Sequence, residues 1–572
     1  MTLGLAVSAS AVFGQNAERN APKVPKPAAV AGSLAAPALA VDSAAGDTTI
    51  VPELKGVVIV DKPKTINPAG AKGVTGLKVG GPDFLLDREF AGVVVPYLGK
   101  PFTNRKLTEL QRDIIVFCRK KDHPVVDVLF EEQEIVDGVI QITVLDGKLG
   151  KVAIRNEGEQ WFKDKFILSN IRLHEGDSLV ESKLVEDINW LNRNPFREVD
   201  IKLRQGEVGR VDLDVEVRDQ RPFRPYLGYE DSLTRILGDH LFFVGFNWGN
   251  AFGWDHQLNY QFSTDIGFQH IRSHSGSYVI PLPWRHTVTI FGSYTDVNPD
   301  ISKLGFPGVT QKGSSYQTSL RYTVPLPKLW KIEHDIAVGA DFKRSDNNLE
   351  FGGTNVFSRP AEIVQFNAGY RGSAADPYGK TTMSAQAYVS PGGFTGVNNN
   401  TNFNSVRQGA VADYYYVRLD AERQTRLPWD FTLVGKGTFQ FSDANLLPSE
   451  QMGLGGYSTI RGYEERLANG DEGYILNAEV WTPVIKTGNL LGKPEWKDTL
   501  QFLAFYDYGS VKFNTVTPGS SNANSNLSSV GGGLRYSVSR NFSLRFDYGI
   551  QLTERELSSR HSRGHLGAQL SF

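Results

Sequence analysis

The C-terminal segment alternates between apolar and polar residues over two consecutive runs. In the last run, Leu566, Ala568, Leu570 and Phe572 fall on every second position. The run before it, from Phe542 to Leu552, has an apolar or aromatic residue at every even-numbered position and a polar residue or glycine between each pair. A repeat of two places one set of side chains on each face of a β-sheet. The pattern allows a soluble sheet with an apolar core, or a membrane barrel with an apolar outer face and a wet lumen.

The composition favours the barrel. The chain of 572 residues has a net charge of −2, 11% aromatic residues, 58 glycines and a mean hydropathy of −0.28. It contains no run of about 18 apolar residues that could form a spanning helix. The length would also suit roughly three or four soluble domains, so the soluble alternative stays open at this point. The single cysteine, Cys118, excludes an intramolecular disulfide framework and a cysteine-rich zinc site.

The N-terminal residues predict an export signal and a linker. Residues 1–15 contain the apolar stretch Leu3–Phe13, which is typical of a signal peptide, but no basic residue precedes Arg19. Either the true start lies upstream, which we favour, or this stretch is not a signal. Residues 16–52 are rich in alanine, proline and serine. Such a composition cannot build a core, so we expect a disordered linker there.

Two units of similar plan follow, at residues 53–147 and 148–219. Each is expected to contain a strand, two helices and two further strands, an internal repeat of one supersecondary unit. The clearest helix is predicted from Asn104 to Lys120, where apolar residues recur at helical spacing.

The repeat resembles the polypeptide-transport-associated (POTRA) domain. In the second unit, the segment Leu191–Val199 resembles the Asn-x-Asn-Pro-x-Arg motif of such domains in two-partner secretion transporters, with Asn194, Pro195 and Arg197 at the motif positions. Pro195 would also end an ordinary helix, so the motif alone does not decide between the two interpretations.

Residues 220–572 are long enough for a transmembrane antiparallel β-barrel of about 16 strands, at roughly 20 to 22 residues for each strand and its loop. Proline and tryptophan recur together at Pro281–Trp284, Pro325–Trp330 and Pro428–Trp429. Proline cannot lie in the middle of a ladder, and tryptophan prefers the membrane boundary. These segments therefore predict turns at one rim of the barrel. The expected fold class is α+β repeats followed by this barrel.

A glycine-rich segment in the barrel carries the most specific motif. Ile460, Arg461, Gly462 and Tyr463 closely resemble the [Val/Ile]-Arg-Gly-[Phe/Tyr] motif of the Omp85 superfamily, and Gly-Asp-x-Gly-Tyr follows at Gly470–Tyr474. In that superfamily the tetrapeptide tips a loop that folds back into the barrel. An arginine in a lumen needs an anion. The segment Gln501–Gly509 resembles the Phe-x-Asp-x-Gly strand motif of the same superfamily, and the resemblance implies an ion pair between Arg461 and Asp507.

Two repeats and one barrel resemble two-partner secretion transporters of the haemolysin secretion/activation type. The resemblance implies an outer-membrane pore that secretes an unfolded exoprotein, with POTRA domains in the periplasm docking this cargo. It also implies contact with outer-membrane lipid, and insertion by the barrel assembly machinery through the terminal Phe572. Members often have an N-terminal helix that plugs the pore, but the prolines of residues 16–52 argue against a helix here.

The alternative function is an assembly factor that inserts other barrels, although such factors usually carry more repeats. An outer-membrane enzyme is a third possibility, but no catalytic motif supports it, and we expect no enzymatic activity. No metal site, cofactor or nucleic-acid partner is expected. His561 and His565 are four residues apart next to a strand, where that spacing separates them by about 13 Å. No nucleotide-binding motif is present either.

Overall fold

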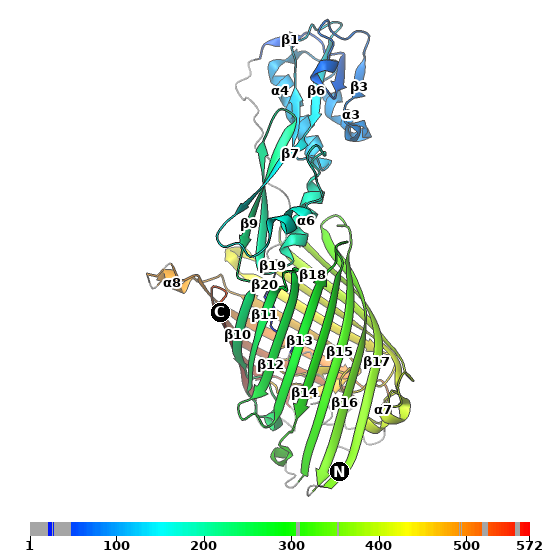
Figure 1. Ribbon diagram of the computed structural model, residues 1–572, viewed down its shortest axis with the longest axis vertical. Helices are drawn as coiled ribbons and strands as arrows, with labels where there is room; N and C mark the ends of the chain where they lie inside the picture. Colours follow the sequence, from blue (N-terminus) through cyan, green and yellow to red (C-terminus); the bar gives the residue numbers. More distant parts are fainter. Residues whose placement is uncertain are drawn as a thin grey trace. The chain divides into compact units, whose positions relative to one another are not determined.

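The computed structural model describes residues 21–25, 27, 47–304, 309–351, 354–490, 492–493, 495–517, 524–554 and 561–572. The chain divides into two compact units (Figure 1). One comprises Lys26–Pro222, and the other comprises Phe223–Phe572 together with the residues up to Pro25.

The first half of the smaller unit is a four-stranded sheet with helices. Its sheet has the order β3-β2-β6-β5, in which β2 is parallel to both β3 and β6. The elements are β1 (Thr49–Val51), β2 (Gly56–Val60), β3 (Gly76–Gly80), α3 (Arg88–Val94), β4 (Phe102–Thr103), α4 (Asn104–Lys120), β5 (Val126–Leu129) and β6 (Val139–Asp146). The expected strand–helix–helix–strand–strand order is present, with β3 added between β2 and α3 and the short β4 added between α3 and α4. Strand β1 pairs with β4 and lies inside the range predicted to be linker, so ordered structure begins before residue 53.

Helix α4 has the bounds that the sequence predicts. Its first turn is capped by Thr103, whose side chain accepts a hydrogen bond from the backbone N–H of Lys106. One face buries Leu110, Ile114 and Phe117 against the sheet. Burial of this stripe holds the helix in place, because most helical stability in proteins comes from packing of the apolar face.

The second half of the smaller unit repeats the plan with three strands. Strand β9 (Arg210–Asp219) lies between β7 (Lys148–Asn156), which is parallel to it, and β8 (Arg197–Gln205), which is antiparallel. Helices α5 (Asp164–Ser169) and α6 (Glu181–Asn192) pack on this sheet through their aliphatic residues. The two halves thus each have their own core, as independent POTRA-like units require.

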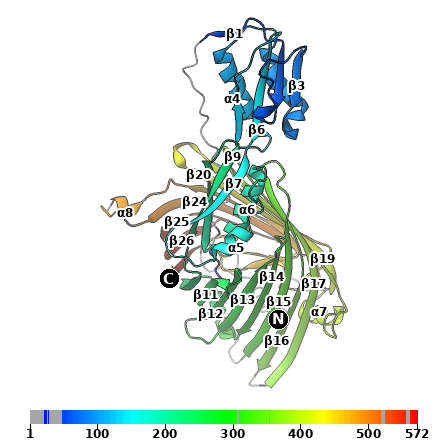
Figure 2. The ribbon, with the colours of Figure 1, turned by 45° about the horizontal axis from the view of Figure 1, so that its top comes forward.

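The larger unit is a closed barrel of sixteen antiparallel strands (Figures 1 and 2). The strands are β10 (Phe223–Glu230), β11 (Leu241–Ala251), β12 (His256–Asp265), β13 (Ile271–Pro281), β14 (Thr287–Val297), β15 (Val309–Pro325), β16 (Ile332–Phe351), β17 (Thr354–Asp376), β18 (Gly379–Pro391), β19 (Asp413–Arg426), β20 (Thr432–Ser442), β23 (Glu472–Trp481), β24 (Asp498–Lys512), β25 (Asn524–Val538), β26 (Phe542–Gln551) and β27 (Ser562–Ser571). Strand β10 pairs with β27 and closes the ring. The expected barrel and its strand number are confirmed.

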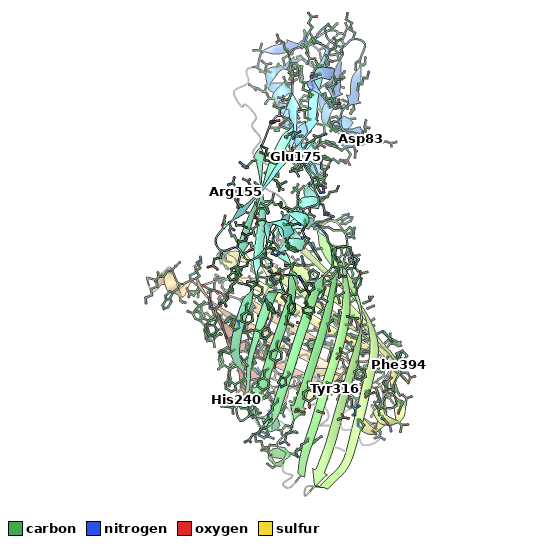
Figure 3. The ribbon with its side chains drawn as sticks, in the orientation of Figure 1. Asp83, Arg155, Glu175, His240, Tyr316 and Phe394 are labelled. Atoms are coloured by element: carbon green, nitrogen blue, oxygen red, sulfur yellow. The ribbon has the colours of Figure 1, made fainter. Side chains whose placement is uncertain are left out.

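Side chains alternate between the two faces of the wall. On β24, Tyr506 is exposed on the outside, whereas Asp507 is fully buried on the inside. Tyr316 likewise stands on the outer face of β15 (Figure 3). The outer face is therefore mostly apolar and aromatic, and buried serine, asparagine, glutamine and aspartate side chains line the inside.

The tryptophans of the barrel gather at one end. Strands β13 and β15 end at Pro281 and Pro325, and Pro428 follows the end of β19, so the three predicted proline–tryptophan turns are confirmed as strand connections. Trp330 is 91% exposed and Trp429 is 86% exposed. Every barrel tryptophan lies in or near a connection at this end, where the chain also ends: Trp248, Trp254, Trp284, Trp330, Trp429, Trp481 and Trp496.

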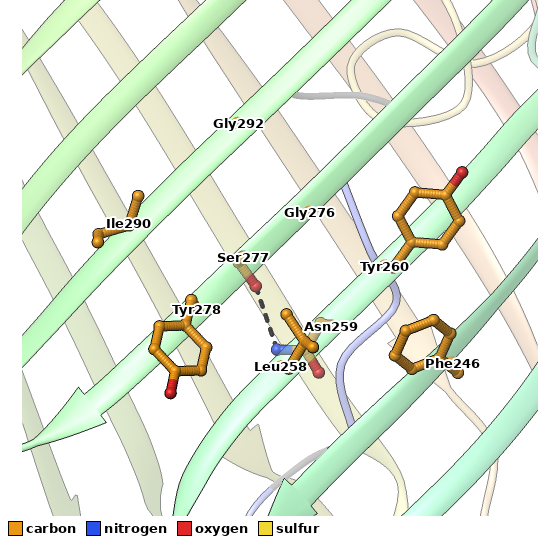
Figure 4. A pocket seen from close by; sticks show the side chains of 9 residues that line it. All are labelled: Phe246, Leu258, Asn259, Tyr260, Gly276, Ser277, Tyr278, Ile290 and Gly292. Carbon is orange, nitrogen blue, oxygen red and sulfur yellow. Dashed lines mark hydrogen bonds between the residues drawn. The ribbon is translucent and has the colours of Figure 1, made fainter. Parts of the chain in front are cut away.

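A shallow apolar hollow lies on the outer face of β12, β13 and β14 (Figure 4). Gly276 and Gly292 are register partners there, and their missing side chains leave the space open. Tyr260, Tyr278 and Ile290 line the hollow. On the inside of the same strands, Asn259 donates a hydrogen bond to Ser277, which shows how sharply the two faces differ.

Candidate functional site: the arginine loop in the barrel lumen

The loop between β20 and β23 folds back into the barrel. It contains the short antiparallel pair β21 (Met452–Leu454) and β22 (Ala468–Gly470). Its Leu454, Ile460 and Tyr463 are buried in one apolar cluster with Val511 and Leu527. Those last two residues face inward from β24 and β25, so this lumen loop (residues 443–471) packs on the inner wall.

Arg461 is held at the tip of the lumen loop by Asp507. The guanidinium makes a two-point contact, with Nε to Oδ2 and Nη2 to Oδ1 both at 2.8 Å. The backbone N–H of Arg461 also donates to Asp507 Oδ2, at 3.1 Å. Arg461 is 3% exposed and Asp507 is completely buried. The structure thus brings together the two residues that the resemblance paired, in the fork geometry that arginine offers to a carboxylate.

Two further carboxylates face the same guanidinium. Glu479 on β23 lies 2.9 Å from Nη2, and Asp547 on β26 lies 3.4 Å from Nη1. The ring of Phe505 stacks on the guanidinium, with the Cζ atom of Arg461 at 3.5 Å from the centroid of the ring. Arg535 pairs with Asp547 at 2.9 Å. The site therefore contains three acidic and two basic side chains, and Arg461 is its central cation.

The next residue, Gly462, lies against the wall backbone. A Cβ on Gly462 would stand 2.9 Å from the carbonyl carbon of Gly549, and its φ of 90° also disfavours other residues. Its N–H donates to Nε2 of His565, and its carbonyl accepts a hydrogen bond from Gln551. Glycine is required here because two backbones approach each other closely.

The flanking residues of the motif anchor the loop in different ways. Ile460 is fully buried in the apolar cluster. The hydroxyl of Tyr463 accepts a hydrogen bond from the N–H of Thr553, and it lies 2.8 Å from the carbonyl oxygens of Ser528 and Thr553. All four motif residues are thus in contact with the wall.

The other predicted residues do not take part in the contacts of this site. Asn194, Pro195 and Arg197 belong to the smaller unit, where Arg197 donates to the carbonyl of Leu191 and lies over the ring of Phe162. Asn194 and Pro195 connect α6 to β8, and Arg197 is the first residue of β8. Phe572 follows β27, and its side chain is 65% exposed. Any role of these residues in transport or assembly stays a prediction.

Sequence reasoning missed several members of the site. Glu479, Asp547, Arg535 and His565 contact the arginine loop or its partners, yet no motif marked them. The alternation of β26 places Asp547 on its polar face, but a single sequence does not show which loop that face meets.

A short N-terminal segment also lies against the inner wall. The N–H of Lys23 donates to the hydroxyl of Tyr226, and its ammonium lies 3.1 Å from Glu230. Residues 21–25 are not helical. Most of the predicted signal and linker lies outside the described residues.

In the described part of the chain, no cluster of three or more histidine, cysteine, aspartate or glutamate side chains could hold a metal ion. None of the helices described there is long and apolar enough to cross a membrane.

The closed barrel, the inward loop with its paired arginine and the two preceding α+β units define an outer-membrane transporter of the Omp85 superfamily. The family model described as haemolysin secretion/activation protein ShlB/FhaC/HecB matches residues 209–536 of this chain. The match covers more than half of the chain, and the chain belongs to this family of two-partner secretion transporters.

Curated relatives support the assignment. The heme/hemopexin transporter protein HuxB of Haemophilus influenzae strain 86-028NP is 24% identical over 474 residues, which cover 80% of this chain and 79% of HuxB. The outer membrane transporter CdiB of Dickeya dadantii strain 3937 is 22% identical over 428 residues, or 69% of this chain and 70% of CdiB. The solved structure of CdiB from Escherichia coli matches with a TM-score of 0.71 and 16% identity, over 97% of this chain and 94% of that one. This last likeness establishes the fold.

Proposed function

We propose that the protein is an outer-membrane pore that exports an unfolded partner protein to the cell surface, after its POTRA-like units have bound that protein in the periplasm. The observation that carries the proposal is the lumen loop, which lies inside a closed barrel with its Arg461 paired to Asp507 of the wall, in a chain of the two-partner secretion family. The relatives point the same way, since HuxB and CdiB are both named as transporters.

The cargo first docks on a sheet edge of the second POTRA-like unit. Strand β8 is an edge strand. The side chain of Asn192 bonds both the N–H and the carbonyl of Val199, so these two groups point away from β9. Because ladder bonds alternate along an antiparallel strand, Ile201 and Leu203 direct their backbone groups to the same edge. An extended cargo can add a strand there through backbone hydrogen bonds, largely independently of its sequence.

Leu203 allows a matched test of docking. Leu203→Pro removes the side chain and the edge N–H, whereas Leu203→Ala removes the side chain alone. We expect the proline variant to secrete much less than the alanine variant at equal abundance in the outer membrane. Equal secretion by the two variants would exclude docking at this edge.

The export function is tested by comparing the surface and released proteins of the native host with and without this gene, using quantitative mass spectrometry. We expect one large exoprotein to disappear from the outside of the cell and to reappear when the gene is restored. An unchanged set of external proteins would refute the proposal and favour the assembly-factor alternative if other barrels were depleted.

Insertion of the barrel into the outer membrane depends on its last strand. Deleting Leu566–Phe572 removes most of β27 and with it the pairing to β10 that closes the barrel. We expect no heat-modifiable protein in the outer membrane after this deletion. Normal insertion of the truncated chain would show that the terminal strand is not needed for assembly.

A further inference from the structure

A second buried arginine, Arg407, is paired at the base of the lumen loop. It follows α7 (Asn400–Val406) in the long connection between β18 and β19. Its guanidinium contacts Asp471 at two points, with Nη1 to Oδ1 at 2.6 Å and Nη2 to Oδ2 at 2.9 Å. Asp471 is fully buried, Arg407 is 8% exposed, and neither takes part in the Arg461 site.

Asp471 joins three separate connections. Its carboxylate also accepts hydrogen bonds from the N–H of Leu446, after β20, and from the N–H of Asn514, after β24. Gln451 donates to it from the lumen loop. Arg407 in turn donates to the carbonyl of Leu446, at 2.6 Å. One carboxylate therefore fastens the β18–β19, β20–β21 and β24–β25 connections together.

The β18–β19 connection is turned into the mouth of the barrel. Phe403 and Val406 of α7 are buried in one cluster with Ile363, Tyr414 and Tyr416. Ile363 on β17 and the two tyrosines on β19 are on the inward-facing sides of their strands, which the exposure of Tyr415 on the opposite side confirms. Helix α7 thus packs on the inner wall, at the end of the barrel opposite the tryptophan-rich rim (Figure 1).

We propose that the Arg407–Asp471 pair is a latch that holds the β18–β19 connection across the exit of the pore and that releases it when cargo passes. The proposal rests on the proposed function, in which this end faces outward and an extended chain must leave through it. The pair is positioned for a latch because it ties the inward-turned connection to the base of the lumen loop. Breaking this buried pair releases the β18–β19 connection from Asp471, while Leu446 and Asn514 keep their own hydrogen bonds to that carboxylate.

The closed state can be tested without cargo, by measuring channel currents of the purified protein in planar lipid bilayers. Arg407→Ala removes the cation, and we expect the open probability to rise about tenfold, which corresponds to roughly 1.4 kcal/mol. Arg423→Ala is the matched control, because Arg423 pairs with Asp376 at 2.6 Å beside the opposite rim. It should leave the currents unchanged. Heat-modifiable mobility of each variant verifies that the barrel has formed.

The requirement for opening is tested by a reversible lock. In the full-length double variant Arg407→Cys/Asp471→Cys, the two thiols are joined by a short bifunctional thiosulfonate. The chain has one native thiol, Cys118, which is buried. Burial raises the pKa of this thiol to about 12, so Cys118 does not react with the cross-linker. We expect the lock to abolish channel opening and dithiothreitol to restore it.

Currents that persist in the locked protein, or an Arg407→Ala variant with the open probability of the wild type, would overturn the latch. Failure of the proposed export function has a different signature, an unchanged set of external proteins in the host, and leaves the current measurements interpretable.

Discussion

The lumen loop is held at its two ends by buried arginines of different design. At the tip, Arg461 faces three carboxylates on the rigid strands β23, β24 and β26. At the base, Arg407 faces the single carboxylate of Asp471, which also accepts hydrogen bonds from backbone N–H groups and an amide.

The difference lies in what remains when the arginine is removed. At the tip, three acids would share a buried site with Arg535 as their remaining cation. At the base, one carboxylate would keep three hydrogen-bond donors. Hydrogen bonds to the charged form stabilise a buried carboxylate, whereas neighbouring like charges destabilise it. Breaking the contacts of Arg461 at the tip therefore costs more free energy than breaking the contact between Arg407 and Asp471 at the base.

The largest effect is expected for Arg461→Ala. Removing one partner of a buried ion pair costs roughly 3–5 kcal/mol, because the other charge is left buried and unmatched. We expect the barrel to form while the loop leaves its seat, so that secretion falls far more than barrel abundance. Hydrogen exchange of residues 452–470 should become much faster. Slow exchange like that of the wild type would contradict the central role of this cation.

A second substitution isolates the excess negative charge. Adding Asp507→Asn to Arg461→Ala removes one of the three acids, and we expect it to recover about 1–2 kcal/mol of the lost stability of the seated loop. Arg461→Lys should recover only part, since an ammonium lacks the planar fork. Both are measured by the same exchange experiment. Strictly additive losses in the double variant would show that the charges do not act as one unit.

A smaller effect is expected at the close approach between the backbone of Gly549, on β26, and the backbone of Gly462, in the lumen loop. A Cβ at Gly549 would lie 2.6 Å from the nitrogen of Gly462, so Gly549→Ala must push the loop tip off the wall. Overpacking of this kind costs about 1–3 kcal/mol. Gly435→Ala on β20 is the control, because a Cβ there meets no atom within 4 Å. Secretion per unit of folded barrel should fall for the first variant alone, and equal values would contradict the close approach.

The smallest effect is expected for Tyr463→Phe. The variant keeps the buried ring and loses a hydroxyl that bonds backbone groups of the wall, which is worth about 1 kcal/mol. Exchange of the loop should rise modestly, and secretion should stay near that of the wild type. A defect as large as that of Arg461→Ala would mean that the hydroxyl, and not the ion pair, holds the loop.

The sequence predicted local features well. The bounds of α4 follow from its apolar stripe, and the inward side of Asp507 follows from alternation with Tyr506 and Tyr508. The strand β3 was missed because Leu77 and Val79 are the only apolar residues between its glycines. Strand β1 was missed because three residues form a strand only by pairing with β4.

Long-range partners were beyond the reach of composition and periodicity. The family motifs paired Arg461 with Asp507. Nothing in a single sequence matches Arg461 with Asp547, 86 positions later, or Arg407 with Asp471. These contacts depend on strand register and on the closure of the barrel, which are tertiary properties.

The order of the site along the chain has a consequence for biogenesis. In the described part of the chain, the wall residues bonded to Arg461 and Gly462 follow the loop in sequence, and His565 comes 103 residues after Gly462, on the final strand. Arg461 is therefore synthesised before the residues that hold it. The full set of contacts at the loop tip needs β26 and β27 in the wall, so a completely seated loop indicates a completed barrel.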